Sequence, residues 1–163
     1  MKHLFIVNPA AGKGKTLNLI PEIEKYCSSR KYEHEIVITN YPGHATEVAK
    51  AFSSMQPLRI YSVGGDGTLN EVLNGMAGSN SSLAAIPSGS GNDFIRSIIG
   101  ANIPGNILIK TIEGTEQQID YAKVNDKYFI NIASVGFDAD VVYQSFHFKK
   151  LPLISGKMAY ILG

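Results

Sequence analysis

The sequence predicts an α/β fold, built as an open, mainly parallel sheet with helices on both faces. Two observations predict this class. From residue 1 to about residue 112, apolar runs of strand length alternate with segments whose apolar residues have helical spacing. The 163 residues also include 16 glycines, with 44% hydrophobic and 18% charged residues, which is typical of one globular domain with many tight turns.

The predicted elements alternate strictly along the chain. Strands are predicted over residues 4–7, 34–39, 57–63 and 82–87, and helices from Thr16 onward and over 42–55, 69–76 and 92–99. In a parallel sheet the loops after the strands meet at one edge, where ligands bind. That edge should therefore carry NPAAGKG (8–14), TNYPG (39–43), GGDGT (64–68) and PSGSGND (87–93).

The pattern changes after Gly114. Two runs with β character are joined by VNDK, which predicts a hairpin with its turn at Asn125-Asp126. We therefore predict an α/β domain over residues 1–124 and the beginning of a second, β-rich domain over 125–163. This second part looks incomplete, because a few strands with an exposed apolar face are marginal on their own. We expect a truncated chain, or a partner that completes the sheet.

Charge and cysteine content limit the classes of partner and compartment. The net charge of +1 lacks the strong basic excess of nucleic-acid-binding proteins, so we predict no nucleic-acid partner. The single cysteine, Cys27, cannot form an internal disulfide, which favours the reducing cytosol. No stretch approaches the ~20 apolar residues of a membrane span.

The GGDGT turn carries the most specific chemistry. Three glycines in four positions directly after a strand are typical of a loop whose backbone N–H groups close on phosphate. Asp66 places a negative charge at the centre of that loop, which would repel a phosphate unless a cation lies between them. Mg²⁺ is commonly held by one or two carboxylates, phosphates and waters. The alternative is that Asp66 caps a helix that begins near Thr68.

The first loop is a second candidate phosphate site. PAAGKGKT (9–16) almost matches the P-loop pattern, but Pro9 occupies the first glycine slot, where free backbone geometry is needed. Gly12 and Gly14 would let the backbone approach an anion, the two lysines add charge, and the following helix would direct its N-terminus there. Asn8 could orient the loop or a ligand through its amide. A flexible turn without a ligand is the alternative.

Four motifs in this order resemble the diacylglycerol kinase catalytic domain, in its bacterial lipid-kinase branch. They are NPAAGKG, GGDGTLNEVLNG, PSGSGNDFIR and IDYAKVNDKYFINIASVGFDADV, and the resemblance covers essentially the whole chain. GGDGT alone is also similar to the turns of NAD kinases and phosphofructokinases, which share the same nucleotide-binding arrangement. An NAD kinase-like phosphotransferase and a non-catalytic nucleotide-binding remnant therefore stay open as alternatives.

The resemblance implies ATP-dependent transfer of the γ-phosphate to the hydroxyl of diacylglycerol or a related lipid, with Mg²⁺. Asp66 and Asp120 are implied as catalytic residues, and Asp66 as the metal-binding residue. Ser90 stands where the family more often has Thr, and it keeps the hydroxyl. The residues implied to contact ATP are Asn8, Pro9, Ala10, Ala11, Gly12, Thr39, Gly64, Gly65, Asp66, Gly67, Thr68, Leu69, Asn70, Glu71 and Ser90.

The resemblance also implies parts that this sequence does not contain. Family members are nearly twice as long, and their β-rich second half carries a general-base Glu. We therefore expect this chain to bind nucleotide but to turn over little or nothing alone. The lipid substrate implies a cytoplasmic protein that is peripheral at the inner membrane surface. The segment FHFKKLPLI (146–154) could touch that surface or pack against the second domain, and a homodimer is a further candidate assembly.

Overall fold

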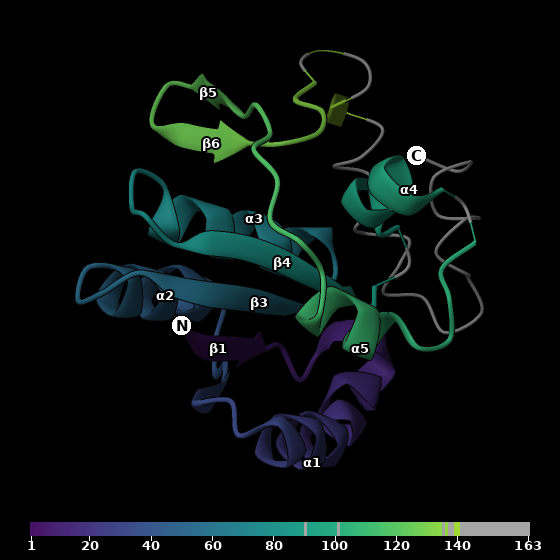
Figure 1. Cartoon of the computed structure of the whole chain (residues 1–163). Coiled ribbons are helices and arrows are strands. Elements are labelled where there is room, and N and C mark those ends of the chain that lie inside the picture. The colour runs from purple at the N-terminus through teal and green to yellow at the C-terminus, as the bar shows by residue number, and fades with distance from the viewer. Residues whose placement is uncertain (90, 101, 135, 137–138, 141–163) are drawn as a thin grey trace. The chain divides into compact units, whose positions relative to one another are not determined.

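The computed structural model describes residues 1–89, 91–100, 102–134, 136 and 139–140 (Figure 1). The chain divides into two compact units, Met1–Asn131 and Ile132–Gly163. Every element named below lies in the first unit. The predicted segment 146–154 lies outside the described residues. The division into two domains at residue 124 stays a prediction, although the hairpin of residues 122–129, which spans this position, belongs to the first unit.

A parallel sheet forms the centre of the first unit. Its strands lie in the order β2-β1-β3-β4, and each neighbouring pair runs parallel. β1 is buried almost throughout, as expected for a strand whose two faces are both covered. These pairings confirm the predicted fold class. The strands are β1 (Lys2–Val7), β2 (His34–Ile38), β3 (Leu58–Gly64) and β4 (Ser82–Pro87).

Helices cover both faces of the sheet (Figure 1). α2 (His44–Ser53) and α3 (Asp66–Met76) pack on the face that carries Leu4 and Ile60. α1 (Ile20–Arg30) and α5 (Ile107–Ile112) pack on the opposite face, around Phe5 and Tyr61. α4 (Asp93–Ile99) contributes to a smaller apolar cluster with residues of α3 and β4. None of the helices in the described part of the chain is long and apolar enough to cross a membrane.

The first helix begins later than the sequence indicates. α1 starts at Ile20, with Pro21 in its first turn, whereas the apolar spacing predicted a start at Thr16. The intervening segment Ala11–Leu19 forms 3₁₀ turns, with left-handed backbone at three successive residues, Gly12, Lys13 and Gly14 (φ 59°, 57° and 85°). Left-handed residues cannot continue a right-handed helix. The prediction that a helix N-terminus follows the first loop directly is therefore wrong.

Two other elements differ from the predicted set. α3 begins at Asp66 and includes the end of the GGDGT turn, whereas the sequence predicted a start at residue 69. α5 has only six residues and was not predicted. The hairpin is confirmed: β5 (Ala122–Val124) and β6 (Lys127–Phe129) pair antiparallel, with Asn125 in the turn at φ 51°.

The hairpin is attached to α3 through side-chain amides. The Tyr128 N–H donates to Asn74 Oδ1 at 2.9 Å, and Asn74 Nδ2 donates to the Tyr128 carbonyl at 2.9 Å. Asn70, one helical turn earlier, donates to the same carbonyl at 3.1 Å. Asn74 thus pairs with one backbone residue of β6 as a neighbouring strand would.

Candidate functional site

Three glycine-containing loops meet at the carboxyl edge of the sheet. A Cβ placed on Gly12 would collide with the hydroxyl and carbonyl oxygens of Ser88, and a Cβ placed on Gly89 would lie 2.7 Å from the Cα of Gly65. The loops after β1, β3 and β4 are therefore in contact through backbone, and a side chain at these glycines would separate them. This arrangement confirms that these loops share one edge of the sheet.

Asn8 and Thr68 connect the first loop to the glycine turn. Asn8 Nδ2 donates to Thr68 Oγ1 at 2.9 Å, while Asn8 Oδ1 accepts the Ala10 N–H at 2.9 Å. Thr16 Oγ1 donates to the Asn8 carbonyl at 2.7 Å, which closes the first loop. A Cβ on Gly64 would lie 2.5 Å from Thr68 Oγ1, so the glycine leaves the space that the threonine fills. The polar side chains here fix the backbone of both loops.

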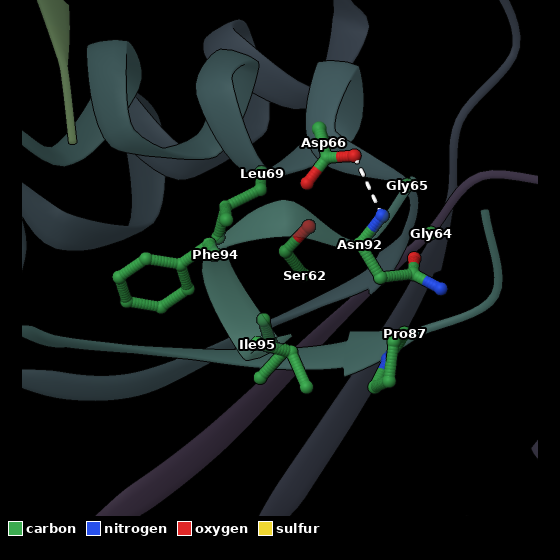
Figure 2. A pocket seen from close by; sticks show the side chains of 10 residues that line it. Ser62, Gly64, Gly65, Asp66, Leu69, Pro87, Asn92, Phe94 and Ile95 are labelled. Atoms are coloured by element: carbon green, nitrogen blue, oxygen red, sulfur yellow. Dashed lines mark hydrogen bonds between the residues drawn. The ribbon is translucent and has the colours of Figure 1, made fainter. Parts of the chain in front are cut away.

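Asp66 caps a helix other than its own. Its Oδ2 accepts the Asn92 N–H at 2.8 Å (Figure 2). Its Oδ1 accepts the Asp93 N–H at 2.9 Å. These amides stand at the start of α4. Gly65, the N-cap of α3, makes no side-chain capping bond. The alternative that Asp66 caps its own helix is therefore wrong, and the first N–H groups of α3 are left at the edge where the loops meet.

A second carboxylate lies beside Asp66. A Cβ built on Gly91 would lie 2.7 Å from Asp66 Oδ2 and 3.5 Å from Asp93 Oδ2, so both carboxylates flank this glycine. The turn that brings them together is closed by Asn92, whose Nδ2 donates to the Gly89 carbonyl at 2.8 Å, with Asn92 itself left-handed at φ 55°. Asp93 was not among the predicted site residues. Its signal in the sequence is a second acid that ends a glycine turn, PSGSGND.

The carboxylate oxygens of Asp66 and Asp93, which flank Gly91, are of the ligand type that Mg²⁺ prefers. A carboxylate offers about four lone-pair sites, and the two N–H bonds occupy two of those on Asp66. Mg²⁺ prefers oxygen ligands and is commonly held by one or two carboxylates with phosphates and waters. Within the described residues no group of three or more His, Cys, Asp or Glu side chains could hold a metal. Asp120 therefore does not join Asp66 and Asp93 in a three-acid site there.

The other predicted residues divide by where their side chains lie. Leu69 is buried in the apolar cluster with Phe94, and Asn70 faces the Tyr128 carbonyl. Gly67 faces open space, since a Cβ there would meet no atom within 4 Å. Thr39 is buried at the end of β2, where its N–H donates to the Val7 carbonyl at 2.9 Å.

The remaining predicted residues lie in turns, in α3, on an exposed segment or outside the described part of the chain. Pro9 and Ala10 form the turn after β1, and Ala11 begins the 3₁₀ segment. The Glu71 carbonyl accepts the Thr46 hydroxyl at 2.9 Å. Asp120 is exposed, two residues before β5. Ser90 lies outside the described residues.

Comparison with known proteins identifies the class to which this fold and site belong. The diacylglycerol kinase catalytic domain matches residues 2–124 of the chain. The chain therefore belongs to the diacylglycerol kinase catalytic domain family.

The chain is also similar in sequence and structure to individual diacylglycerol kinases. The chain is 34% identical to a diacylglycerol kinase of Bacillus subtilis, over 97% of this chain and 52% of the relative. It is 37% identical to a diacylglycerol kinase of Staphylococcus epidermidis, over 97% of this chain and 50% of the relative. A solved structure of a diacylglycerol kinase from Bacillus anthracis matches with a TM-score of 0.62 at 28% identity, over 94% of this chain and 55% of that chain. The chain thus spans about half the length of the curated relatives that it matches.

Proposed function

We propose that this chain is the nucleotide-binding part of an ATP-dependent lipid kinase, which transfers the γ-phosphate to the hydroxyl of diacylglycerol or a related lipid. The observation that carries the proposal is the position of Asp66. Its carboxylate is held at the junction of the glycine loops by two backbone N–H groups, beside the first turn of α3. Membership of the diacylglycerol kinase catalytic domain family supports the same reaction.

The residues of the site can bind the phosphates of ATP without a basic side chain in the GGDGT turn. The first N–H groups of α3 have no side-chain cap, and they carry the positive end of the helix dipole. Gly67, in this first turn, leaves open space where a ligand can approach the backbone. The loop after β1, held by Asn8, would contact the nucleotide from the other side. In phosphoryl transfer, positioning of this kind and charge neutralisation account for most of the catalysis.

Asp66 and Asp93 would hold Mg²⁺. The metal supplies charge neutralisation between the ATP phosphates and the carboxylates. The protein's own contribution is to hold Asp66 in one orientation, because both of its oxygens are fixed by the start of α4. Asp120, which is exposed and precedes β5, stays a prediction as a catalytic residue.

The proposal includes a place of action. A kinase that phosphorylates a membrane lipid must reach its headgroup at the bilayer surface, so we place the protein in the cytoplasm, peripheral at the inner membrane surface. Assembly as a homodimer stays a prediction. So does the expectation that this chain alone turns over little or nothing, because the general base of the family lies in a second half.

The proposal is tested by offering diacylglycerol and NAD side by side with ATP labelled in the γ-phosphate. The assay uses this chain and a protein that extends it to the length of its relatives. We expect label in phosphatidic acid from the longer protein and little from this chain. Label in NAD would replace the lipid kinase by an NAD kinase. The absence of transfer from every protein that contains the chain would favour a nucleotide-binding remnant.

A matched pair of variants isolates the role of Gly67. A methyl group at Gly67 meets no protein atom, so Gly67→Ala should fold normally but obstruct the approach of a phosphate to the backbone of α3. We expect the affinity for MgATP, measured by calorimetry, to fall at least about tenfold. Gly105→Ala, at a glycine that also faces open space, is the control and should bind as the parent does. Equal affinity in both variants would remove Gly67 from the nucleotide site.

A further inference from the structure

A small cavity lies beneath the glycine turn, between β3, β4, α3 and α4 (Figure 2). It has a volume of about 10 Å³, which is the room that one water molecule needs. Part of its wall is apolar, formed by Leu69, Ala85 and Phe94, and part is polar, formed by Ser62, Asp66 and Asn92.

Ser62 gives the cavity an unusual property. Ser62 lies on β3, is only 2% exposed, and alternates with Tyr61 and Val63, whose side chains pack on the opposite face of the sheet. Its Oγ is the buried side-chain oxygen or nitrogen for which the described residues provide no hydrogen-bond partner. A buried hydroxyl without a partner is costly, and native proteins usually satisfy such groups with protein atoms or with an ordered water.

Asp66 offers the second partner that a water at this position needs. Figure 2 shows the Ser62 hydroxyl and the Asp66 carboxylate lining the same small space. Each carboxylate oxygen already accepts one N–H group, from Asn92 or from Asp93, and each keeps a further lone pair. Small cavities with wholly apolar walls stay dry, whereas a cavity that offers a water molecule two to four polar partners retains it.

We propose that one buried water molecule occupies this cavity and joins the Ser62 hydroxyl to the Asp66 carboxylate. The water donates one hydrogen to a carboxylate oxygen of Asp66. It forms its second hydrogen bond with Ser62 Oγ, which can donate or accept. Asp66 is then held from two sides, by the amides at the start of α4 and by β3 through the water. This site goes beyond the proposed kinase function and does not depend on it, because it concerns the packing of Ser62 and Asp66 and not the binding of nucleotide.

Thermal unfolding of Ser62→Ala tests the proposal through the sign of its effect. If the water is present, the substitution removes one of its partners, and the melting temperature falls by a few degrees. If the cavity is dry, the substitution removes an unpaired buried hydroxyl, and the melting temperature stays the same or rises. Ser29→Ala, which removes a hydroxyl from the exposed side of α1, is the control and should leave the melting temperature nearly unchanged.

A crystal structure of the unsubstituted chain that resolves ordered waters tests the proposal independently of any variant. We expect one ordered water within hydrogen-bond distance of both Ser62 Oγ and an Asp66 carboxylate oxygen. An empty cavity, or a Ser62 hydroxyl bonded directly to a protein atom, would overturn the proposal. Neither thermal unfolding nor the crystal structure depends on kinase activity. Both results would therefore stay valid if the proposed kinase function were wrong.

Discussion

Asp66 has one observed role, as a helix cap, and one proposed role, as a metal-binding residue. Its place in a glycine turn suggests a metal-bridged nucleotide, and its two hydrogen bonds make it the cap of α4, which begins 27 residues later at Asp93. The tasks are compatible, because a carboxylate can accept backbone N–H groups on one side and bind a cation on the other. The same side chain therefore orders the loops and, under the proposed function, supplies charge to the site.

Replacement of Asp66 separates these tasks. Asp66→Ala leaves the Asn92 and Asp93 amides without their acceptor, and we expect the free energy of unfolding to fall by about 1.5–3 kcal/mol. Asp66→Asn keeps one carbonyl oxygen, so it should cost less stability while still removing the charge. Urea unfolding measures the first effect and phosphate transfer in the longer protein measures the second. A stability of Asp66→Ala equal to that of the parent would show that the cap of α4 contributes nothing.

The close approach of α2 and α3 depends on one glycine. A Cβ on Gly75 would collide with the Thr46 carbonyl and lie 2.8 Å from the Ala49 Cβ. Gly75→Ala should therefore push the two helices apart and destabilise the protein by about 1–3 kcal/mol, despite the higher helix propensity of alanine.

Gly67→Ala, in the same helix, is the matched control for Gly75→Ala. Its methyl group has open space, so helix propensity should leave the stability unchanged or raise it by up to about 1 kcal/mol. Chemical denaturation of the two variants measures the difference. If both variants have the same stability, the contact between α2 and α3 is looser than described.

The side chain of Asn74 attaches the hairpin to α3. Asn74→Ala removes the two hydrogen bonds that Asn74 makes to the Tyr128 backbone and leaves the bond from Asn70 to the Tyr128 carbonyl. We expect the Tyr128 amide to exchange its hydrogen faster by at least about tenfold, because its acceptor is lost. Asn18→Ala, at an exposed residue of the 3₁₀ segment, should leave that amide protected. Unchanged exchange of Tyr128 in Asn74→Ala would contradict the attachment.

The order of strands and helices was predictable because each apolar run and each helical spacing lies within one short stretch of sequence. The first helix was placed too early because the left-handed backbone at Lys13 follows from loop packing, which local spacing does not show. The cap of α4 by Asp66 and the amide bonds of Asn74 to Tyr128 join residues 26 to 54 positions apart, and no local pattern encodes them. The glycine motifs nevertheless located the correct edge of the sheet.

The two edges of the sheet have different chemistry. The carboxyl edge carries the glycine loops and Asp66, and the amino edge carries a stack of rings centred on His3. The His3 ring lies 4.9 Å from that of Tyr32 and 5.6 Å from that of Tyr61, and His3 Nδ1 is 2.9 Å from the Tyr61 hydroxyl. Burial, and then the nearby charge of Arg59, lower the pKa of His3, while Glu113 acts in the opposite direction.

The lowered pKa of His3 predicts the direction of a pH effect on stability. Between its folded pKa and the ordinary value of about 6.5, the unfolded chain binds a proton at His3 that the folded protein does not. The free energy of unfolding contributed by His3 is therefore fully present above that ordinary value and falls as the pH drops below it.

His3→Phe checks this effect, because the substitution keeps an aromatic ring in the stack and removes the titrating group. Urea unfolding of the parent and of His3→Phe between pH 5 and pH 8 should show a smaller dependence on pH in the variant. His44→Phe, whose ring stacks on Tyr41 away from His3, serves as the control for loss of another histidine. The same pH dependence in the parent and in His3→Phe would contradict the assignment.

The central claim is that the loops after β1, β3 and β4 bind the phosphates of MgATP. Two-dimensional NMR of the isotopically labelled chain, titrated with MgATP, tests it most directly, because every glycine amide gives its own signal. We predict saturable shifts of the Gly12, Gly65, Gly67 and Gly89 amides, with little change at Gly105 or Gly114. Shifts confined to other parts of the chain, or no shifts at millimolar MgATP, would contradict the claim.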